Sequence, residues 1–213
     1  MNRKGYILFW GLLFPVFLSA QSTISLDLFP VGMHLYDRSR SFLFENRIDY
    51  NGNAVVEPGV ILTYEFFTKE TKRGFQIQQG FYSDAAAQIS AWTQFSFRVK
   101  LFHKYKHKVS LAAGPALVYR KGWYLLEGYA DNPEDSYEPN GPWEFRWAVP
   151  VQLQYNYYTG SRSELNVSLL YHYERHTLFP SIGFKFWIST KVKNPADCNC
   201  NSSFKKKRLR DWF

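Results

Sequence analysis

The chain has 213 residues, of which 46% are hydrophobic and 19% aromatic, yet its mean hydropathy is only −0.35. Beyond the N-terminal segment no apolar run approaches the ~20 residues that a membrane-spanning helix requires, which excludes a helical membrane protein. Part of the net charge of +8 lies in residues 205–210, and in an exported chain such charge favours anionic lipid headgroups or phosphate over nucleic acid.

The N-terminus has the three parts of a secretory signal peptide. Arg3 and Lys4 provide a positive start, residues 6–17 are apolar and uncharged, and the small residue Ala20 ends the stretch. The alternative, an uncleaved anchor, is disfavoured because the apolar stretch is short. Residues 1–20 are therefore expected to be a cleaved signal peptide, residues 21–190 a single folded domain, and residues 191–213 a basic, flexible tail.

About eight later segments alternate between apolar and polar side chains, with the period of a β-strand. They cover residues 22–29, 59–67, 74–82, 88–102, 108–119, 145–158, 163–174 and 177–188. The fourth segment is the most regular, with Phe95 and Phe97 on one face and Ser96 and Arg98 on the other. The pattern predicts an all-β protein.

The segments favour a transmembrane barrel over a soluble sandwich or lipocalin-like barrel. Several exceed the ~5–6 residues common in soluble strands. Their apolar faces end in aromatic residues, as interfacial girdles do, and their other faces carry charges and amides. The connections predict an antiparallel up-and-down meander: short turns at 69–73, 103–107 and 159–163 on one rim, and long loops at 30–58 and 121–144 on the other.

Over residues 22–188 this organisation resembles the small eight-stranded outer-membrane β-barrels of Gram-negative bacteria. The resemblance is one of architecture and carries no family-specific motif. It implies a location in the cell outer membrane and contact with its lipids. Many such proteins end their last strand on a terminal aromatic residue, whereas here the last segment ends near Trp187, and Phe213 follows a long tail.

Six charged residues are predicted to face the lumen. They are Glu65, Arg98, Lys100, Arg146, Glu174 and Lys185. An eight-stranded barrel is just wide enough to be filled by side chains, and buried charges need partners. We therefore expect a packed polar plug, with a conducting pore or a ligand site at the mouth as alternatives.

Ser168, His172 and Glu174 are weak candidates for catalysis, and His172, Glu174 and His176, which share one face of a strand, are weak candidates for a metal site. However, strand residues i and i+4 stand ~13 Å apart, so only a turn between Arg175 and Leu178 would bring His172 and His176 together. Outer-membrane lipid A deacylases are similar in size but carry a His-x-Ser pair that this chain lacks. No catalytic residue, metal or cofactor is therefore assigned.

The loop at 121–144 places five aromatic residues among carboxylates, a composition that suits recognition, calcium binding or simple packing. They are Trp123, Tyr124, Tyr129, Tyr137 and Trp143. In the tail, Cys198 and Cys200 are too few for a zinc site, and a disulfide or pairing with a partner remains open.

The sequence thus predicts a non-enzymatic outer-membrane barrel with a structural role or a recognition role for its loops. Two alternatives stay open: a lipid A-modifying or other lipid-hydrolysing barrel enzyme, and an accessory subunit of an envelope or secretion complex, with envelope proteins bound through loops or tail.

Overall fold

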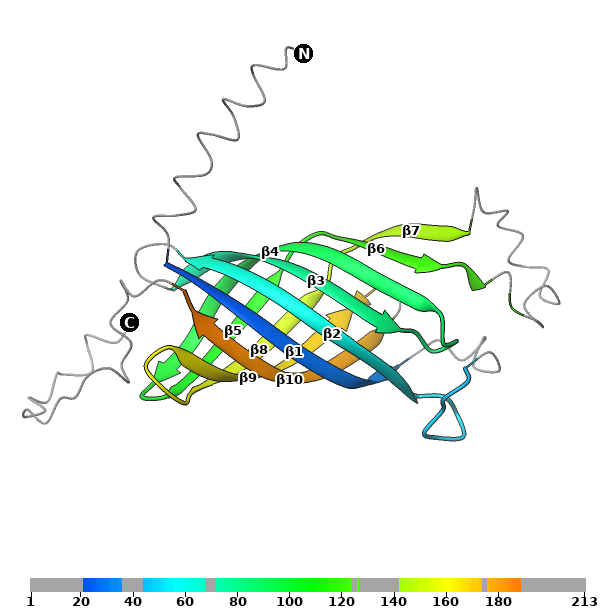
Figure 1. Ribbon diagram of the computed structural model, residues 1–213, viewed down its shortest axis with the longest axis horizontal. Coiled ribbons are helices and arrows are strands. Elements are labelled where there is room, and N and C mark those ends of the chain that lie inside the picture. The colour runs from blue at the N-terminus through cyan, green and yellow to red at the C-terminus, as the bar shows by residue number, and fades with distance from the viewer. Residues whose placement is uncertain are drawn as a thin grey trace, which may run out of the picture.

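The computed structural model describes residues 21–35, 44–67, 72–123, 126, 142–173 and 176–188. Within these ranges the chain forms one antiparallel sheet that closes on itself (Figure 1). Its strands are β1 (Gln21–His34), β2 (Ala54–Phe67), β3 (Arg73–Ser83), β4 (Ile89–Lys104), β5 (His107–Ala113), β6 (Ala116–Lys121), β7 (Trp143–Ala148), β8 (Val151–Tyr158), β9 (Ser163–His172) and β10 (Thr177–Trp187). No helix in this described part is long and apolar enough to cross a membrane.

Two barrel strands are interrupted, so the ten segments build an eight-stranded barrel. Gly114 and Pro115 separate β5 from β6, and Val149 and Pro150 separate β7 from β8. Proline has no N–H to donate to a β-ladder, which explains the breaks. The side-chain amide of Gln94 donates to the freed Pro150 carbonyl at 3.1 Å. The predicted all-β, up-and-down barrel of about eight strands is confirmed.

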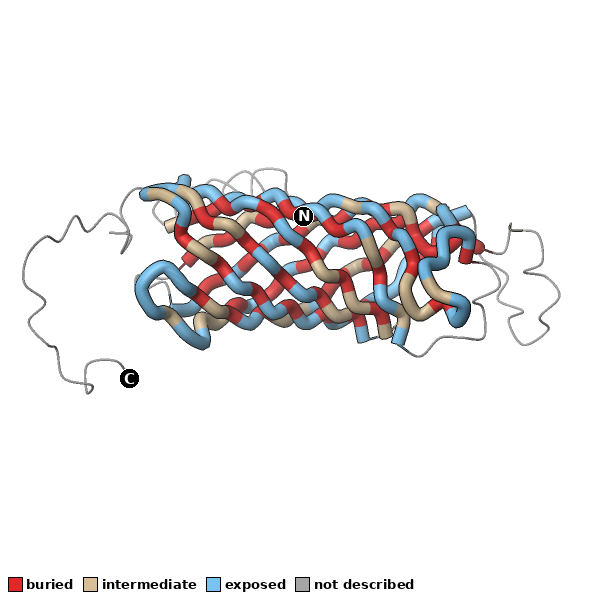
Figure 2. The backbone as a smooth tube through the Cα atoms, turned by 90° about the horizontal axis from the view of Figure 1, so that it is seen from below, coloured by how far each residue is buried: buried red, intermediate tan, exposed pale blue. Residues whose placement is uncertain are grey.

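Burial follows the alternation of the sequence. Exposed and buried residues alternate along the strands in Figure 2. The outward side chains are apolar: Leu26, Phe95 and Phe184 are 53%, 48% and 54% exposed. The inward set is largely polar and includes fully buried glutamine side chains. An apolar exterior around a polar interior is the arrangement of a membrane barrel and the reverse of a soluble one.

The connections divide between two rims. The β2–β3, β4–β5 and β8–β9 connections lie at the rim that also carries the start of β1 and the end of β10, which we call the inner rim. The β1–β2, β3–β4, β6–β7 and β9–β10 connections lie at the opposite, outer rim. This is the arrangement that the alternating segments predict.

The first external loop is shorter than predicted. The sequence predicts a first strand that ends at Phe29 and a second strand that begins at Gly59, with Pro30 and Pro58 as the ends of the loop between them. In the structure β1 and β2 instead resume pairing beyond the prolines, from Val31 opposite Val56 onwards, after a register shift. The predicted signal peptide, 1–20, and the tail, 191–213, with Cys198 and Cys200, lie outside the described residues.

Closure of the barrel depends on a close approach at Gly183. This residue lies opposite Asp27, and a Cβ atom here would be 2.0 Å from the Leu26 carbonyl oxygen. Gly183→Val is therefore expected to separate β1 from β10 and to destabilise the barrel by at least about 1–3 kcal/mol. The measurement is the thermal midpoint of the heat-modifiable gel shift in detergent. Gly160→Ala is the control, because a Cβ there meets only the Ser163 hydroxyl, at 3.0 Å. Equal midpoints for the two variants would contradict the account.

Candidate functional site

The middle of the lumen holds a network around one carboxylate, which we call the polar core. Glu65 on β2 accepts a hydrogen bond from Lys185 Nζ on β10 at 2.7 Å and lies 3.5 Å from Arg98 Nε on β4. Thr23 Oγ1 also donates to Glu65, at 3.0 Å. All four side chains are buried, so these contacts compensate charges that water does not reach.

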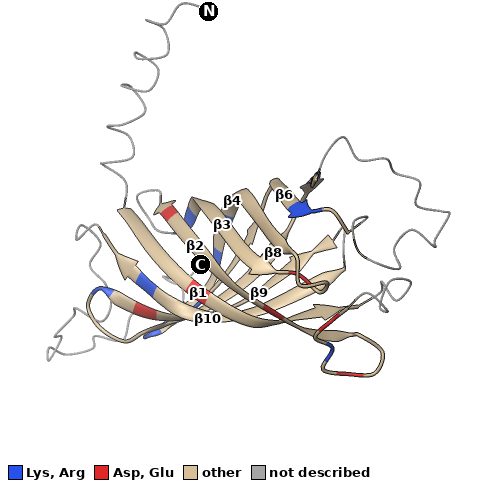
Figure 3. Ribbon diagram, turned by 45° about the vertical axis from the view of Figure 1, so that its right-hand side comes forward, with Lys and Arg blue, Asp and Glu red and all other residues tan. Residues whose placement is uncertain are grey.

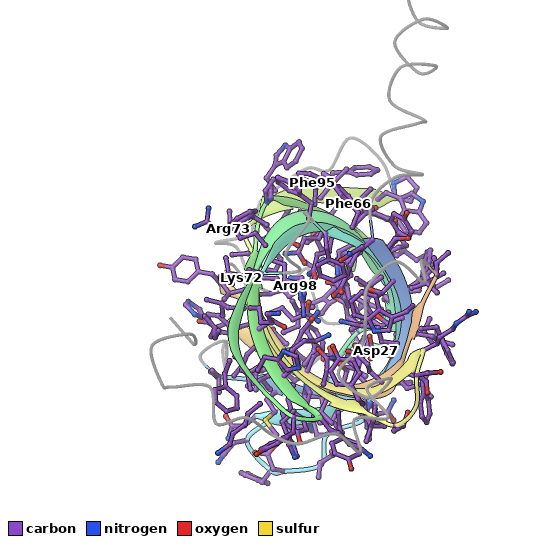
Figure 4. The ribbon with its side chains drawn as sticks, turned by 90° about the vertical axis from the view of Figure 1, so that its left-hand side faces the viewer. Asp27, Phe66, Lys72, Arg73, Phe95 and Arg98 are labelled. Atoms are coloured by element: carbon purple, nitrogen blue, oxygen red, sulfur yellow. The ribbon has the colours of Figure 1, made fainter. Side chains whose placement is uncertain are left out.

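Amides and hydroxyls extend the polar core across the barrel. The Gln154 carbonyl oxygen accepts from Arg98 Nε at 3.3 Å and from Lys185 Nζ at 3.4 Å. Gln152 accepts from the amides of Gln76 and Gln154, at 3.0 and 2.9 Å. Seen along the barrel, Arg98 and Asp27 lie inside the ring of strands, whereas Phe66 and Phe95 point outward (Figure 4).

Asp27 anchors a second part of the polar core. It accepts from Asn166 Nδ2 at 2.6 Å and from Ser25 Oγ at 3.2 Å. Asn156 in turn donates to the Asn166 carbonyl oxygen at 2.7 Å. The chain of contacts joins β1, β9 and β8, so the polar core ties together strands that are distant in sequence.

Towards the inner rim the lumen is closed by a layer that combines rings with one ion pair. Lys108 Nζ lies 2.6 Å from Glu164 Oε2, and Trp187 Nε1 donates to the other carboxylate oxygen at 2.6 Å. Lys108 also lies over the rings of Tyr158 and Trp187, 5.2 and 5.3 Å from their centres. Phe67 stacks on Trp187 with ring centres 5.4 Å apart.

Towards the outer rim an outer aromatic layer fills the lumen. Phe29, Tyr82, Trp92 and Phe179 pack with ring centres 5.1–5.9 Å apart. Gly80 provides space for the indole, because a Cβ there would lie 2.3 Å from Trp92. The sequence predicts a lumen filled by polar side chains, without this aromatic layer. Phe29, Trp92 and Phe179 nevertheless share the strand phase of the inward polar residues.

Above this layer, loop residues form an outer cap, defined by Phe44, Val55, Ala85, Ala86 and Trp123. Asp84 organises it: its carboxylate accepts from Trp123 Nε1 at 2.8 Å, from Ser90 Oγ at 3.1 Å and from the Gln88 N–H at 2.9 Å. Arg120 stacks over Trp123 at 4.4 Å and pairs with Glu144 at 2.8 Å. The cap therefore joins three outer connections.

The structure brings together three of the six predicted lumen charges, namely Glu65, Arg98 and Lys185. Lys100 is half-buried near the inner rim, because it lies beside a register shift in the β4–β5 ladder. Arg146 does not join the polar core: its side chain is 56% exposed and lies 3.6 Å from Glu144, on a strand that projects beyond the barrel wall. Glu174 lies outside the described residues.

The weak catalytic candidates occupy different layers. Ser168 Oγ lies 2.7 Å from Ser181 Oγ and accepts from Gln152 in the polar core. The His172 ring packs on Trp92 and Phe179, with centres 5.3 and 5.6 Å apart. His176 Nδ1 lies 2.9 Å from the hydroxyl oxygen of Tyr171, within hydrogen-bond distance. Among the described residues there is no group of three or more side chains that could hold a metal ion.

Of the predicted recognition residues, Trp123 is buried in the outer cap and Trp143 is 44% exposed at the start of β7. Tyr124, Tyr129 and Tyr137 lie outside the described residues. The sequence reading also missed Asp84 and the Lys108–Glu164 pair. Lys108 and Glu164 share the strand phase of the inward residues Ser110 and Asn166, so alternation alone could have identified them. Asp84 lies in the turn between β3 and β4, where alternation gives no direction.

Removing the central carboxylate should destabilise the barrel. Glu65→Gln leaves Lys185 and Arg98 without their counter-charge in a buried site, which typically costs about 3–5 kcal/mol. The free energy of unfolding in urea, with the protein in phospholipid vesicles, measures the effect. Arg146→Gln is the control, since that cation is more than half exposed. A loss for Glu65→Gln no larger than that of the control would contradict this role.

Asp84 should fix the position of the Trp123 indole in the outer cap. Asp84→Asn keeps the size of the side chain but replaces one acceptor oxygen with a donor, which weakens the bonds from Trp123 and Ser90. We expect a red-shifted tryptophan emission that disappears in a Trp123→Phe background. An unchanged emission spectrum in Asp84→Asn would show that Asp84 does not hold this indole.

No family model matches this sequence, and no curated protein matches it. Solved structures do match by shape. Neisserial surface protein A aligns with a TM-score of 0.50 and 10% identity, over 78% of this chain and 96% of that one. Ail of Yersinia pestis aligns with a TM-score of 0.46 and 7% identity, over 79% and 97% of the chains. The N-terminal β-barrel domain of Pseudomonas aeruginosa OprF aligns with a TM-score of 0.47 and 10% identity, over 80% of this chain and 100% of that one. The chain thus has the fold of the small eight-stranded outer-membrane β-barrels.

Proposed function

We propose that this chain is a non-enzymatic outer-membrane β-barrel that recognises an extended segment of a partner protein through its β6–β7 ribbon. The proposal includes export with removal of residues 1–20, and a periplasmic position for residues 191–213. The observation that carries it is the edge of β7 outside the plugged barrel, which pairs with no further strand among the described residues. The filled lumen supports a role for the outer surface rather than for transport.

The β6–β7 ribbon extends beyond the barrel wall. β9 has 10 residues, which matches the ~9–11 that a spanning strand needs, and Tyr171 near its end lies opposite Val151. β7 continues past that level and, among the described residues, pairs with β6 alone (Figure 1). An open strand edge is not tolerated in hydrocarbon, so this edge belongs outside it.

The hydrogen-bond phase indicates which groups lie on the free edge. The Gly122 N–H donates to the Pro142 carbonyl at 3.0 Å, so these residues form a hydrogen-bonded pair. Because such pairs alternate with non-bonded pairs, the backbone groups of Glu144 and Arg146 point to β6. Those of Trp143, Phe145 and Trp147 point to the free edge. Such an edge is a template for an added strand.

Side chains of the ribbon add specificity to the edge. Phe145 and Trp147 are 66% and 75% exposed on its outward face, and aromatic residues are frequent anchors of interfaces. Arg146, on the other face, offers a half-exposed cation. A partner strand that alternates apolar and acidic side chains would match both faces. Charged residues also occur at scattered positions along the other strands (Figure 3).

Proline at position 145 tests the edge directly. Phe145→Pro removes an N–H that points away from β6 and should leave the ribbon intact, whereas Phe145→Ala keeps that N–H. A photo-cross-linking residue at Trp147, used on intact cells, should yield a protein adduct that Phe145→Pro reduces about tenfold, as loss of one well-placed hydrogen bond can do. Phe145→Ala should reduce it less. Equal effects of the two substitutions, or lipid adducts alone, would overturn the proposal.

The alternative of a lipid-modifying enzyme has its own test. His172→Ala should leave the mass spectrum of lipid A in expressing cells unchanged, because His172 packs in the outer aromatic layer apart from Ser168. Loss of a modified lipid A species in this variant would instead favour the enzyme.

A further inference from the structure

An apolar groove crosses the lipid-facing wall where β1, β2 and β3 approach the outer rim. It has a volume of about 640 Å³, and its lining includes Leu28, Pro30, Pro58, Val60, Phe81 and Ile89. These six side chains are all exposed on the outward face. The surroundings of this face in a membrane barrel are hydrocarbon, so the occupant must be apolar.

The groove coincides with a break in the backbone ladder. β1 and β2 pair in register as far as Phe29 opposite Gly59, and pairing resumes only at Val31 opposite Val56. Within this break Pro30 on β1 lies opposite the two residues Glu57 and Pro58 on β2. Neither proline has an N–H, so neither can donate a ladder hydrogen bond, and the strands cannot close tightly here.

A glycine keeps the base of the groove thin. A Cβ atom at Gly59 would lie 2.3 Å from the Phe29 ring and 2.5 Å from Tyr82 Cβ. The aromatic rings therefore pack directly behind the backbone, inside the lumen, and leave no side chain of residue 59 in the wall. The floor of the groove is thus strand backbone that is backed by Phe29 and Tyr82 of the outer aromatic layer.

The position of the groove along the strands indicates which end of a lipid chain would lie in it. Leu28 lies seven residues along β1 from Gln21 at the inner rim, and a spanning strand has ~9–11 residues. The groove therefore lies in the outer half of the membrane, close to the headgroups. Ser83, at its outer edge, adds a hydroxyl-bearing residue on that side.

We propose that this groove is a binding site for the hydrocarbon chain of an outer-leaflet lipid, held near its headgroup end at the Pro30–Pro58 break. The site goes beyond the proposed recognition role and does not depend on it. It depends on the barrel spanning a membrane, and its assignment to the outer leaflet rests on the proposed periplasmic position of the inner rim. A chain seated there contacts the apolar side chains that line the groove and fills the depression beside the broken ladder.

The test uses a phospholipid with a photoactivatable group near the carboxyl end of one acyl chain, mixed into phosphatidylcholine vesicles that contain the protein. Adducts mapped by mass spectrometry should concentrate on residues 28–30, 58–60 and 81–83, at least about fivefold above those on β8. Val60→Trp, which fills the groove, should remove this excess. Leu153→Trp is the matched control, because Leu153 is equally lipid-facing but lies on β8, away from the groove.

Two results would overturn the site. Adducts spread evenly around the barrel would show only general contact with the bilayer, and an excess that survives Val60→Trp would place the lipid elsewhere. The heat-modifiable gel shift of Val60→Trp, measured in parallel, establishes that this variant is folded. Because β7 is unchanged in it, cross-linking from Trp147 separates failure of this site from failure of the recognition role.

Discussion

The contact on which the rest of the structure depends is the one between Glu65 and its two cations in the middle of the lumen. A barrel of this size has no room for water to solvate Lys185 and Arg98, so each charge must be compensated by the protein itself. The strands that supply these residues, β2, β4 and β10, lie at different positions around the ring. Pairing them through one carboxylate therefore fixes the cross-section of the barrel as well as the composition of its interior.

Around this pairing the lumen is organised in layers. The polar core lies between two groups of aromatic side chains, Trp187 and its neighbours at the inner end and Trp92 and its neighbours at the outer end. The buried charges pair with one another, and many of the amides form hydrogen bonds within the polar core, although Gln78 Oε1, Gln94 Oε1 and Asn156 Oδ1 have no partner among the described residues. The consequence for function is that chemistry or transport through the lumen would require this packing to open, whereas the outer cap, the projecting ribbon and the lipid-facing wall are available as they stand.

Alternation predicted much of this and failed in identifiable places. It identified eight strands and correctly directed Glu65, Arg98 and Lys185 inward, because a period of two leaves no freedom once one face must meet lipid. Arg146 lies beside Glu144 with its side chain more than half exposed, because β7 extends beyond its neighbour β9, which the sequence does not reveal. Alternation predicts that the first strand ends before Pro30 and that the second begins after Pro58. In sequence, a proline that removes one hydrogen bond from a β-ladder cannot be distinguished from a proline that ends a strand. The aromatic residues of the lumen were missed because an inward phenylalanine and an outward one have the same hydropathy.

The central claim is that the lumen is filled by packed side chains, and the proposed roles of the outer surface and the wall rest on it. Single-channel recording on the purified protein in planar phospholipid bilayers tests it most directly. A folded barrel, verified by its heat-modifiable gel shift, should insert without producing conductance steps. Stable, stepwise ion currents from the unmodified protein would contradict the account, since they would require an open water-filled path through the polar core and both aromatic layers.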